Sequence, residues 1–299
     1  MSAYGKDLGY LTQYIRKLRG GSQPILARAS DGQLYVVKFT NIFERPNLPF
    51  NESMGAELYR LFNLCVPSWR PLLVTSSFLD HNPDCWNETA EGKLRPDEGL
   101  CFASRFLGGD GIRLLELLPG AYLNRVRNSI DFWAAWLIDV CADHASHRVA
   151  IFTEERSRSL HAHFVSHCHM FGGLDGNLKT EPSKTRYLDE RIYPDIGPEG
   201  LNRLVRRLHR LDVDGLWRES RTLPVEWLTD SALCAFQCTL NRLADLRFLQ
   251  KSADAIFDTK SREFGLVQFG KRRSVFRAGA VSAFRSSDST HASRSSMGL

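Results

Sequence analysis

Residues 16–39 read RKLRGGSQPILARASDGQLYVVKF, and this stretch predicts the start of the fold. Two apolar runs flank the turn-forming residues 30–32 (SDG), which is typical of a β-hairpin. A glycine pair at 20–21 precedes the hairpin, and its second strand ends on Lys38. Glycines let backbone amides approach phosphate oxygens closely, and a lysine on a strand can neutralise those oxygens. The pattern fits a phosphate-binding hairpin, and it also fits a plain turn followed by a surface lysine.

The sequence around this hairpin predicts a small sheet with one helix. Residues 51–64 (NESMGAELYRLFNL) carry apolar side chains at helical spacing. Residues 71–78 and 100–106 have the composition of strands, and the Asn-, Pro- and Glu-rich residues 80–98 between them indicate a loop. A buried lysine needs an anionic partner, and the predicted helix offers Glu52 and Glu57.

The pattern becomes helical from Leu114 onward. Residues 130–144 (IDFWAAWLIDVCADH) and 198–212 (PEGLNRLVRRLHRLD) each predict a helix, and residues 224–251 predict two more. The arginine face of residues 198–212 is interpreted as solvated. We therefore expect an α+β chain with two lobes, a sheet-rich lobe over 1–109 and a mostly helical lobe over 110–270, joined at the glycine pair 108–109.

The positive charge of the chain lies in its last residues. The chain has a formal net charge of +5, with 39 Lys and Arg against 34 Asp and Glu. Residues 271–299 hold six of the basic residues and one of the acidic ones, which leaves 33 of each in residues 1–270. This serine-rich tail has no long apolar period, so we predict that it is disordered. Nucleic-acid binding is expected only through the tail, if at all.

Composition also indicates the cellular compartment in which the protein is expected. The sequence has no apolar run near the length of a membrane-spanning helix and no secretory leader, so no membrane partner is expected. The seven cysteines are odd in number, widely scattered and without a CxxC motif. This usage favours free thiols in a reducing compartment, and the prediction is a cytoplasmic protein.

Two further stretches carry the chemistry. They are VCADHASHRVAIF at residues 140–152 and FVSHCHMFGG at residues 164–173. Together with the order GGS…YVVKF…NE…GLxF and the stretch LLPGAYLNRVRNSIDFWAAWLIDV at residues 117–140, they resemble the HipA-like kinase domain found in many bacterial proteins. The resemblance covers roughly residues 10–250 and extends to RYLDERIYP and LPVEW.

The resemblance implies a bilobal protein-kinase-like fold that binds ATP and Mg²⁺ and transfers a phosphoryl group to a protein Ser or Thr hydroxyl. In such kinases one aspartate orients the hydroxyl and accepts its proton, and another holds the metal. The residues that match the family pattern are the phosphate loop Gly20, Gly21 and Ser22, the nucleotide lysine Lys38, its partner Glu52, and His144 and Arg148 of the catalytic segment.

The sequence departs from the family pattern at both aspartates. Ser146 stands at the position of the catalytic aspartate, and Ser166 stands at the position of the metal-binding aspartate. Val149 and Cys168 replace a glutamine and a glycine of the pattern. A serine hydroxyl accepts no proton near pH 7 and is a poor Mg²⁺ ligand. The expectation is a pseudokinase, or a very weak kinase, that senses nucleotide or binds a protein partner, and the role of Mg²⁺ is in doubt.

Two alternatives stay open from the sequence. In the first, Asp143 replaces the lost base and the chain is an active Ser/Thr kinase; Asp175 lies too far along to replace the metal ligand. In the second, the chain is a metal-binding hydrolase built on the cluster His144, His147, His161, His163, His167, Cys168 and His169, because zinc takes three or four such ligands.

Overall fold

The computed structural model describes residues 8–40, 46–109, 111–154, 156–173, 176, 178 and 186–261. One compact unit ends at Ala253. The predicted tail at 271–299, residue 110 at the predicted lobe boundary, and Asp175 all lie outside the described residues. The lobe boundaries therefore stay predictions.

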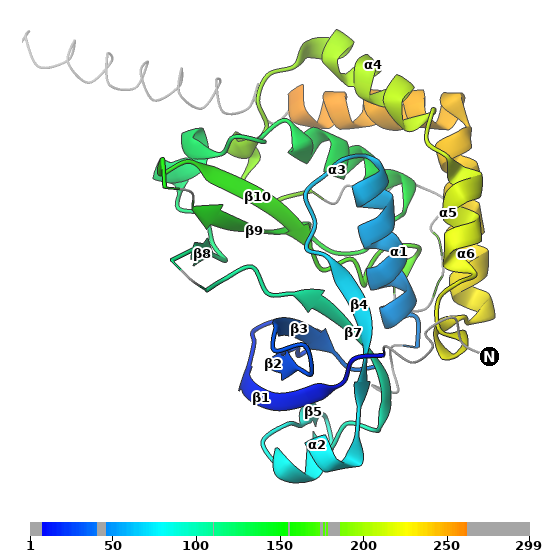
Figure 1. Ribbon diagram of the computed structural model, residues 1–299. Helices are drawn as coiled ribbons and strands as arrows, with labels where there is room; N and C mark the ends of the chain where they lie inside the picture. The colour runs from blue at the N-terminus through cyan, green and yellow to red at the C-terminus, as the bar shows by residue number, and fades with distance from the viewer. Residues whose placement is uncertain are drawn as a thin grey trace, which may run out of the picture. The chain divides into compact units, whose positions relative to one another are not determined.

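The amino-terminal part is a five-stranded antiparallel sheet in the order β1-β2-β3-β7-β4. Figure 1 shows this sheet with helix α1 beside β4 and β7. Its elements are β1 (Leu11–Lys17), β2 (Ile25–Ala29), β3 (Leu34–Lys38), α1 (Leu48–Leu61), β4 (Trp69–Val74), α2 (Ser76–His81), β5 (Asn87–Thr89), β6 (Gly92–Leu94) and β7 (Gly99–Arg105).

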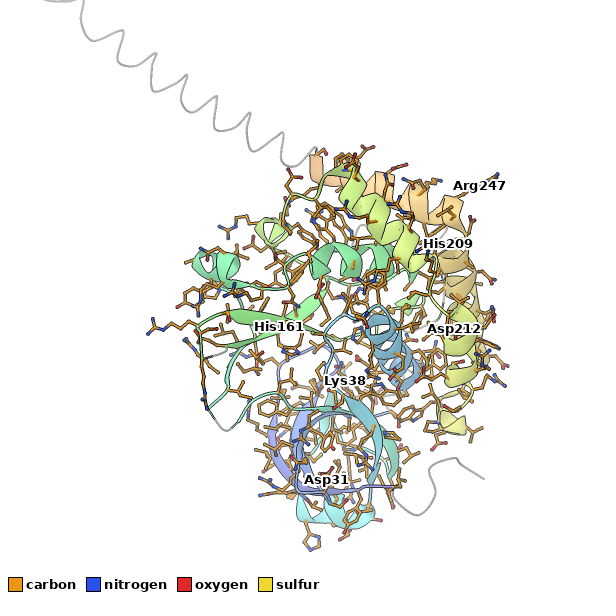
Figure 2. All side chains as sticks on the ribbon, turned by 45° about the horizontal axis from the view of Figure 1, so that its top comes forward. Asp31, Lys38, His161, His209, Asp212 and Arg247 are labelled. Carbon is orange, nitrogen blue, oxygen red and sulfur yellow. The ribbon has the colours of Figure 1, made fainter. Side chains whose placement is uncertain are left out.

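The predicted hairpin is confirmed as β2 and β3. Its turn includes Gly32 at φ +77°, in the left-handed region that glycine adopts without strain. Figure 2 labels Asp31 in this turn and Lys38 at the far end of β3. Strand β3 pairs with β7 on its other side, so Lys38 sits on an interior strand, opposite Phe102.

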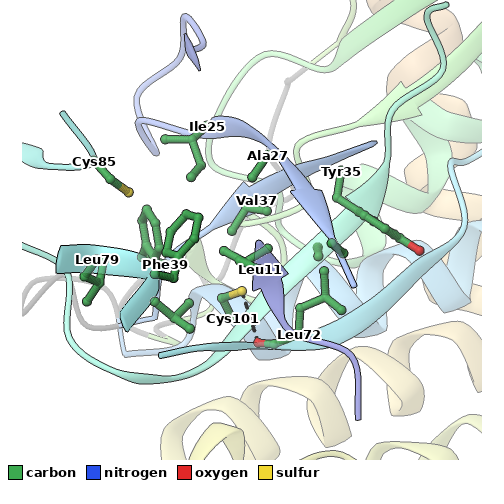
Figure 3. Packing of buried hydrophobic residues seen from close by; sticks show 14 residues of the cluster. Leu11, Ile25, Ala27, Tyr35, Val37, Phe39, Leu72, Leu79, Cys85 and Cys101 are labelled. Atoms are coloured by element: carbon green, nitrogen blue, oxygen red, sulfur yellow. Dashed lines mark hydrogen bonds between the residues drawn. The ribbon is translucent and has the colours of Figure 1, made fainter. Parts of the chain in front are cut away.

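One face of the sheet closes over its own apolar core. Alternate side chains of the strands, among them Leu11, Ala27, Val37 and Leu72, are buried together with Phe39 (Figure 3). The Cys101 thiol donates a hydrogen bond to the Leu72 carbonyl oxygen, 3.2 Å away, and so joins β7 to β4. The alternation of side chains expected for strands thus positions β3 and its lysine.

Two predictions for this part are wrong. The stretch 71–78 is not one strand, because β4 ends at Val74 and Thr75 caps α2 by accepting a hydrogen bond from the Phe78 amide at 3.1 Å. Residues 80–98 are not only a loop, since β5 and β6 form a short hairpin whose turn uses Gly92 at φ +128°. The sheet therefore comes with two helices in place of one.

The carboxy-terminal part is mostly helical. It contains β8 (Arg113–Leu115), η1 (Gly120–Arg125), α3 (Asp131–Cys141), β9 (Val149–Glu154), β10 (Leu160–Val165), η3 (Glu190–Ile192), α4 (Gly197–Leu208), α5 (Val213–Ser220), η4 (Val225–Trp227) and α6 (Asp230–Ala244), and residues 246–261 are again helical.

The helices predicted over 130–144 and 198–212 are confirmed as α3 and α4, but the region from Leu114 onward is not all helical. Strands β8, β9 and β10 form a three-stranded antiparallel sheet in the order β10-β9-β8. Phe132 of α3 packs against Phe164 and Phe152 of this sheet, with ring centroids 5.0 and 6.4 Å away. Within the described residues, no helix combines the length and apolar character needed to cross a bilayer.

Candidate functional site

Lys38 and Glu52 form a buried ion pair. Lys38 ends β3, Glu52 lies in the second turn of α1, and each side chain is less than a tenth exposed. Burial by itself would lower the pKa of Lys38, but the Glu52 carboxylate raises it above its usual value. Burial would likewise raise the pKa of Glu52, and Lys38 holds it below its usual value. Both groups are therefore charged at neutral pH.

The other glutamate offered by the sequence is not the partner of this lysine. Glu57 lies one and a half turns further along α1, where its Oε1 accepts a hydrogen bond from Trp69 Nε1 at 2.7 Å and pairs with Arg60. Glu52 is thus the carboxylate that α1 directs at Lys38.

The expected phosphate loop is the turn between β1 and β2. Gly20 adopts φ +142°, and its carbonyl accepts a hydrogen bond from the Gln23 amide at 2.9 Å. A Cβ built at Gly21 meets no atom within 4 Å, whereas Ser22 is buried. The Gln23 side chain ties this turn to the β5–β6 hairpin by accepting from the Glu88 amide at 2.7 Å and donating to its carbonyl. The turn therefore leaves Gly21 open on one side while its base is anchored.

The segment that contains Ser166 folds against α1. The Glu52 carboxylate accepts hydrogen bonds from the backbone amides of His167 at 3.1 Å and Cys168 at 3.0 Å. Asn51, the preceding residue, donates to three carbonyl oxygens of the same segment. Burial, with the nearby Glu52 charge, raises the pKa of the Cys168 thiol to about 11, so it stays protonated at neutral pH.

A second buried ion pair joins Arg148 to Asp139. The Arg148 Nε donates to Asp139 Oδ2 at 2.9 Å and its Nη2 donates to Oδ1 at 2.5 Å, in a two-pronged contact between fully buried side chains. The Tyr59 hydroxyl of α1 donates to the same Asp139 Oδ1 at 2.8 Å, and the Arg148 guanidinium lies 4.9 Å above the Tyr59 ring. Arg148 Nη1 also donates to the Val165 carbonyl at 3.1 Å. This network connects α1 and α3 with the two stretches 140–152 and 164–173.

His144 brings the two serines together. Its Nδ1 lies 2.5 Å from the Ser146 carbonyl oxygen, and its Nε2 lies 3.5 Å from the Ser166 carbonyl oxygen. Burial and the positive charge of Arg148 lower the pKa of His144 to about 4, so the ring is neutral at pH 7. The two segments meet again where the Ala145 amide donates to the His169 carbonyl at 2.9 Å. Residues 146 and 166, where the resemblance implies the two aspartates, are therefore neighbours.

Asp143 is buried more deeply than Ser146. Its residue exposure is 1%, whereas Ser146 is half-buried. Asp143 has φ +46° and Ser166 has φ +66°, both in the left-handed region that Asn and Asp tolerate better than most residues. A carboxylate at position 166 would thus fit the backbone, and Asp143 offers little of its side chain to a substrate.

The histidines do not form one cluster. His161 Nε2 lies 3.0 Å from Cys65 Sγ, and His163 Nε2 lies 3.0 Å from Thr153 Oγ1. His167 packs edge-on against Tyr59 with ring centroids 4.8 Å apart. In the part of the chain that the structure describes, no three His, Cys, Asp or Glu side chains are grouped to hold one metal ion.

The motif segments do not fit Mg²⁺ either. This ion favours carboxylate ligands, and positions 146 and 166 present hydroxyls. Asp139 is occupied by Arg148 and Tyr59, and Asp143 is buried. The described residues of this site therefore do not form a magnesium site of the kind that kinases use.

Sequence reasoning missed Asp139, Tyr59 and Asn51. Asp139 could have been found, because a lone acid within the apolar run of residues 132–142 indicates a buried, paired charge. Asn51 and Tyr59 gave no such signal, since their partners are backbone carbonyls and side chains far along the chain.

Comparison with solved structures finds kinases. The Helicobacter pylori proinflammatory kinase CtkA is similar over 82% of this chain and 97% of that chain, with a TM-score of 0.51 and 14% identity. A Golgi casein kinase has a TM-score of 0.48 and 11% identity, and it covers 82% of this chain and 74% of that chain. Its structure with Mn/ADP bound has a TM-score of 0.48 and 9% identity, with 82% and 73% covered.

No protein-family model matches the chain, and no curated protein matches its sequence. The structural likeness at this level of identity concerns the fold alone. It agrees with the order of the elements, in which the third strand carries the lysine and the following helix carries its glutamate, as in protein kinases. The chain has an α+β, bilobal protein-kinase-like fold.

Proposed function

We propose that this chain is a HipA-like kinase-fold protein that binds ATP but transfers phosphate very weakly or not at all, and that it acts as a nucleotide-sensing or protein-binding module. One observation carries the proposal. Lys38 and Glu52 form a buried ion pair of the kind that kinases use, while serines occupy the two positions around His144 where the resemblance implies aspartates.

The nucleotide-binding half of the proposal rests on Lys38 and the turn at Gly20, Gly21 and Ser22. Glu52 keeps Lys38 charged, so its ammonium can neutralise phosphate oxygens in the way that P-loop and kinase lysines do. Gly21 leaves room for phosphate oxygens to approach the backbone of the turn. The proposed ligand is ATP without an essential metal, because the described residues of the site lack the carboxylates for Mg²⁺.

The loss of phosphotransfer rests on Ser146 and Ser166. A hydroxyl neither accepts the substrate proton at neutral pH nor holds a metal well, and losing both carboxylates removes several orders of magnitude in rate. Asp143 would have to act from a position that is 1% exposed. This burial favours the impaired enzyme over the active Ser/Thr kinase that would use Asp143.

The partner proposed for such a module is another protein. The location proposed is the cytoplasm, and it is supported by all seven cysteines being free thiols, which suits a reducing compartment.

The nucleotide proposal is tested by thermal unfolding with and without ATP, each with and without Mg²⁺. A ligand at 100 times its Kd that binds only the folded form adds about 2.7 kcal/mol to the free energy of unfolding. Gly21→Asp and Gly21→Asn form a matched pair, because the space around Gly21 admits both and they differ by one negative charge. ATP should stabilise the wild type and Gly21→Asn, and Gly21→Asp should lose most of that effect. No ATP effect on the wild type would refute nucleotide binding.

The phosphotransfer proposal is tested with radiolabelled ATP, the wild type and Asp143→Asn. We expect no transfer at ordinary kinase rates, either to the chain itself or to a general protein substrate. Transfer by the wild type that Asp143→Asn abolishes would show an active kinase in which Asp143 is the base. Asn tolerates the φ of +46° at this position, so the variant is expected to fold.

A further inference from the structure

Asn51 makes a contact that no part of the proposed nucleotide chemistry requires. Its side-chain Nδ2 lies 3.0, 2.9 and 2.8 Å from the carbonyl oxygens of Cys168, Met170 and Gly173. The residue is 1% exposed. The side chain can only be oriented this way, because a turned amide would place Oδ1 against three carbonyl oxygens.

The segment that Asn51 holds is also fixed through its amides. The amides of His167 and Cys168 donate to Glu52, as described above. The Phe171 amide donates to the Ala142 carbonyl at 2.7 Å, and so ties the segment to the motif that contains Ser146. Asn51 thus binds carbonyls of residues 167–173, and the next residue of α1, Glu52, binds the first two amides of the same segment.

Packing tightens the same contact. A Cβ at Gly55, one turn after Asn51, would lie 2.5 Å from His167 Cβ and 2.8 Å from Met170 Sδ. Only glycine lets α1 approach the segment this closely. Further along, Gly176 packs against the Ser231 carbonyl, since a Cβ there would lie 2.9 Å from that oxygen.

We propose that Asn51 is a positioning residue: its amide holds residues 167–173 in the conformation that directs the Glu52 carboxylate at Lys38, so the ion pair is assembled before any ligand binds. The order of action follows the contacts, from Asn51 to the carbonyls of the segment, from the segment amides to Glu52, and from Glu52 to Lys38. In kinases that are switched on by phosphorylation, such a pair forms only when the helix is repositioned. In this chain the contacts of Asn51 and Glu52 already hold α1 against residues 167–173, and these contacts are called the latch below.

The value of the latch for binding ATP rests on the proposed function, but the latch itself does not. Its test therefore uses the ligand-free full chain and hydrogen exchange, which reports local opening. Asn51→Asp and Asn51→Leu keep the number and branching of the side-chain heavy atoms and remove both donors at neutral pH. We expect amides in residues 165–173 to exchange at least tenfold faster in both variants, while the exchange rates of amides in α4 are unchanged. Low concentrations of urea should not change these faster rates, because local opening exposes little surface.

The matched control is Asn241→Asp, the same chemical change at an exposed position of α6, and it should leave exchange in residues 165–173 unchanged. Equal exchange of this segment in the wild type and in folded Asn51 variants would overturn the proposal. A change spread evenly over α4 and the segment would also overturn it, because it would show a role in global stability only.

If the variants do not fold, the wild type still gives a measurement that can overturn the proposal. The latch requires that the Phe171 amide of the ligand-free wild type exchanges at least a hundredfold slower than an unstructured amide. Exchange at the unstructured rate would overturn the latch. ATP titration is a separate readout, so a chain whose segment behaves as expected but binds no ATP would refute the proposed function and leave the latch standing.

Discussion

Replacing Glu52 by glutamine should destabilise this protein more than the loss of one charge on the surface would. Glu52 is 2% exposed, pairs with Lys38 and accepts the amides of His167 and Cys168. Breaking a buried ion pair by removing one partner costs about 3–5 kcal/mol, because the other charge stays buried without compensation. Glutamine also turns one acceptor into a donor that faces a donor amide. We expect a loss of about 4 kcal/mol, which corresponds to a fall in Tm of about 8–16 °C for a chain of this size.

Urea unfolding followed by circular dichroism and tryptophan fluorescence gives the measurement. The matched control is Asp80→Asn, which removes the same charge from the exposed pair with Arg95 and should change stability by less than about 1 kcal/mol. The double variant Lys38→Met with Glu52→Gln should be more stable than Glu52→Gln alone, because no buried charge is left unpaired. Stability of Glu52→Gln within 1 kcal/mol of the Asp80→Asn variant would refute the reasoning, and so would a double variant weaker than both single ones.

Three further outcomes are expected. Burial lowers the pKa of His144 to about 4 from about 6.5 in the unfolded chain, so protons favour the unfolded state between these values. The free energy of unfolding should fall as pH drops from 6.5 towards 4, by up to about 1.4 kcal/mol per pH unit from this group, and His144→Asn should make the fall less steep, with His163 and His167 keeping part of it. Ser166→Asp should make ATP affinity depend on Mg²⁺, measured by isothermal titration calorimetry, and equal affinities with and without the metal would contradict this. Gly55→Ala should cost about 1–3 kcal/mol in urea unfolding because its Cβ would meet His167, whereas Gly21→Ala, in open space, should change stability by less than about 0.5 kcal/mol; similar values for both would show that α1 can move away from the segment.

Elements whose residue pattern is local could be predicted from the sequence. The alternation around residues 30–32 predicted the hairpin that ends on Lys38, and helical spacing predicted α1, α3 and α4. The order of motifs also led to the α+β, bilobal kinase-like fold that the structure and its comparison with CtkA confirm. Periodicity succeeds here because it reports which face of an element is buried, and that face depends on nearby residues only.

The hydrogen-bond partners of the buried polar groups could be found only in the folded chain. Local pattern could not indicate that Asn51 reaches carbonyls 117 to 122 residues away, or that His144 lies between Ser146 and Ser166. The pairing of β8 with β9 was missed for the same reason, since the paired residues lie about 40 residues apart. The β9–β10 hairpin is local, and it was missed within a region interpreted as helical. A buried polar group must find a hydrogen-bond partner wherever the folded chain supplies one, and that place is set by the packing of distant elements and not by spacing along the sequence.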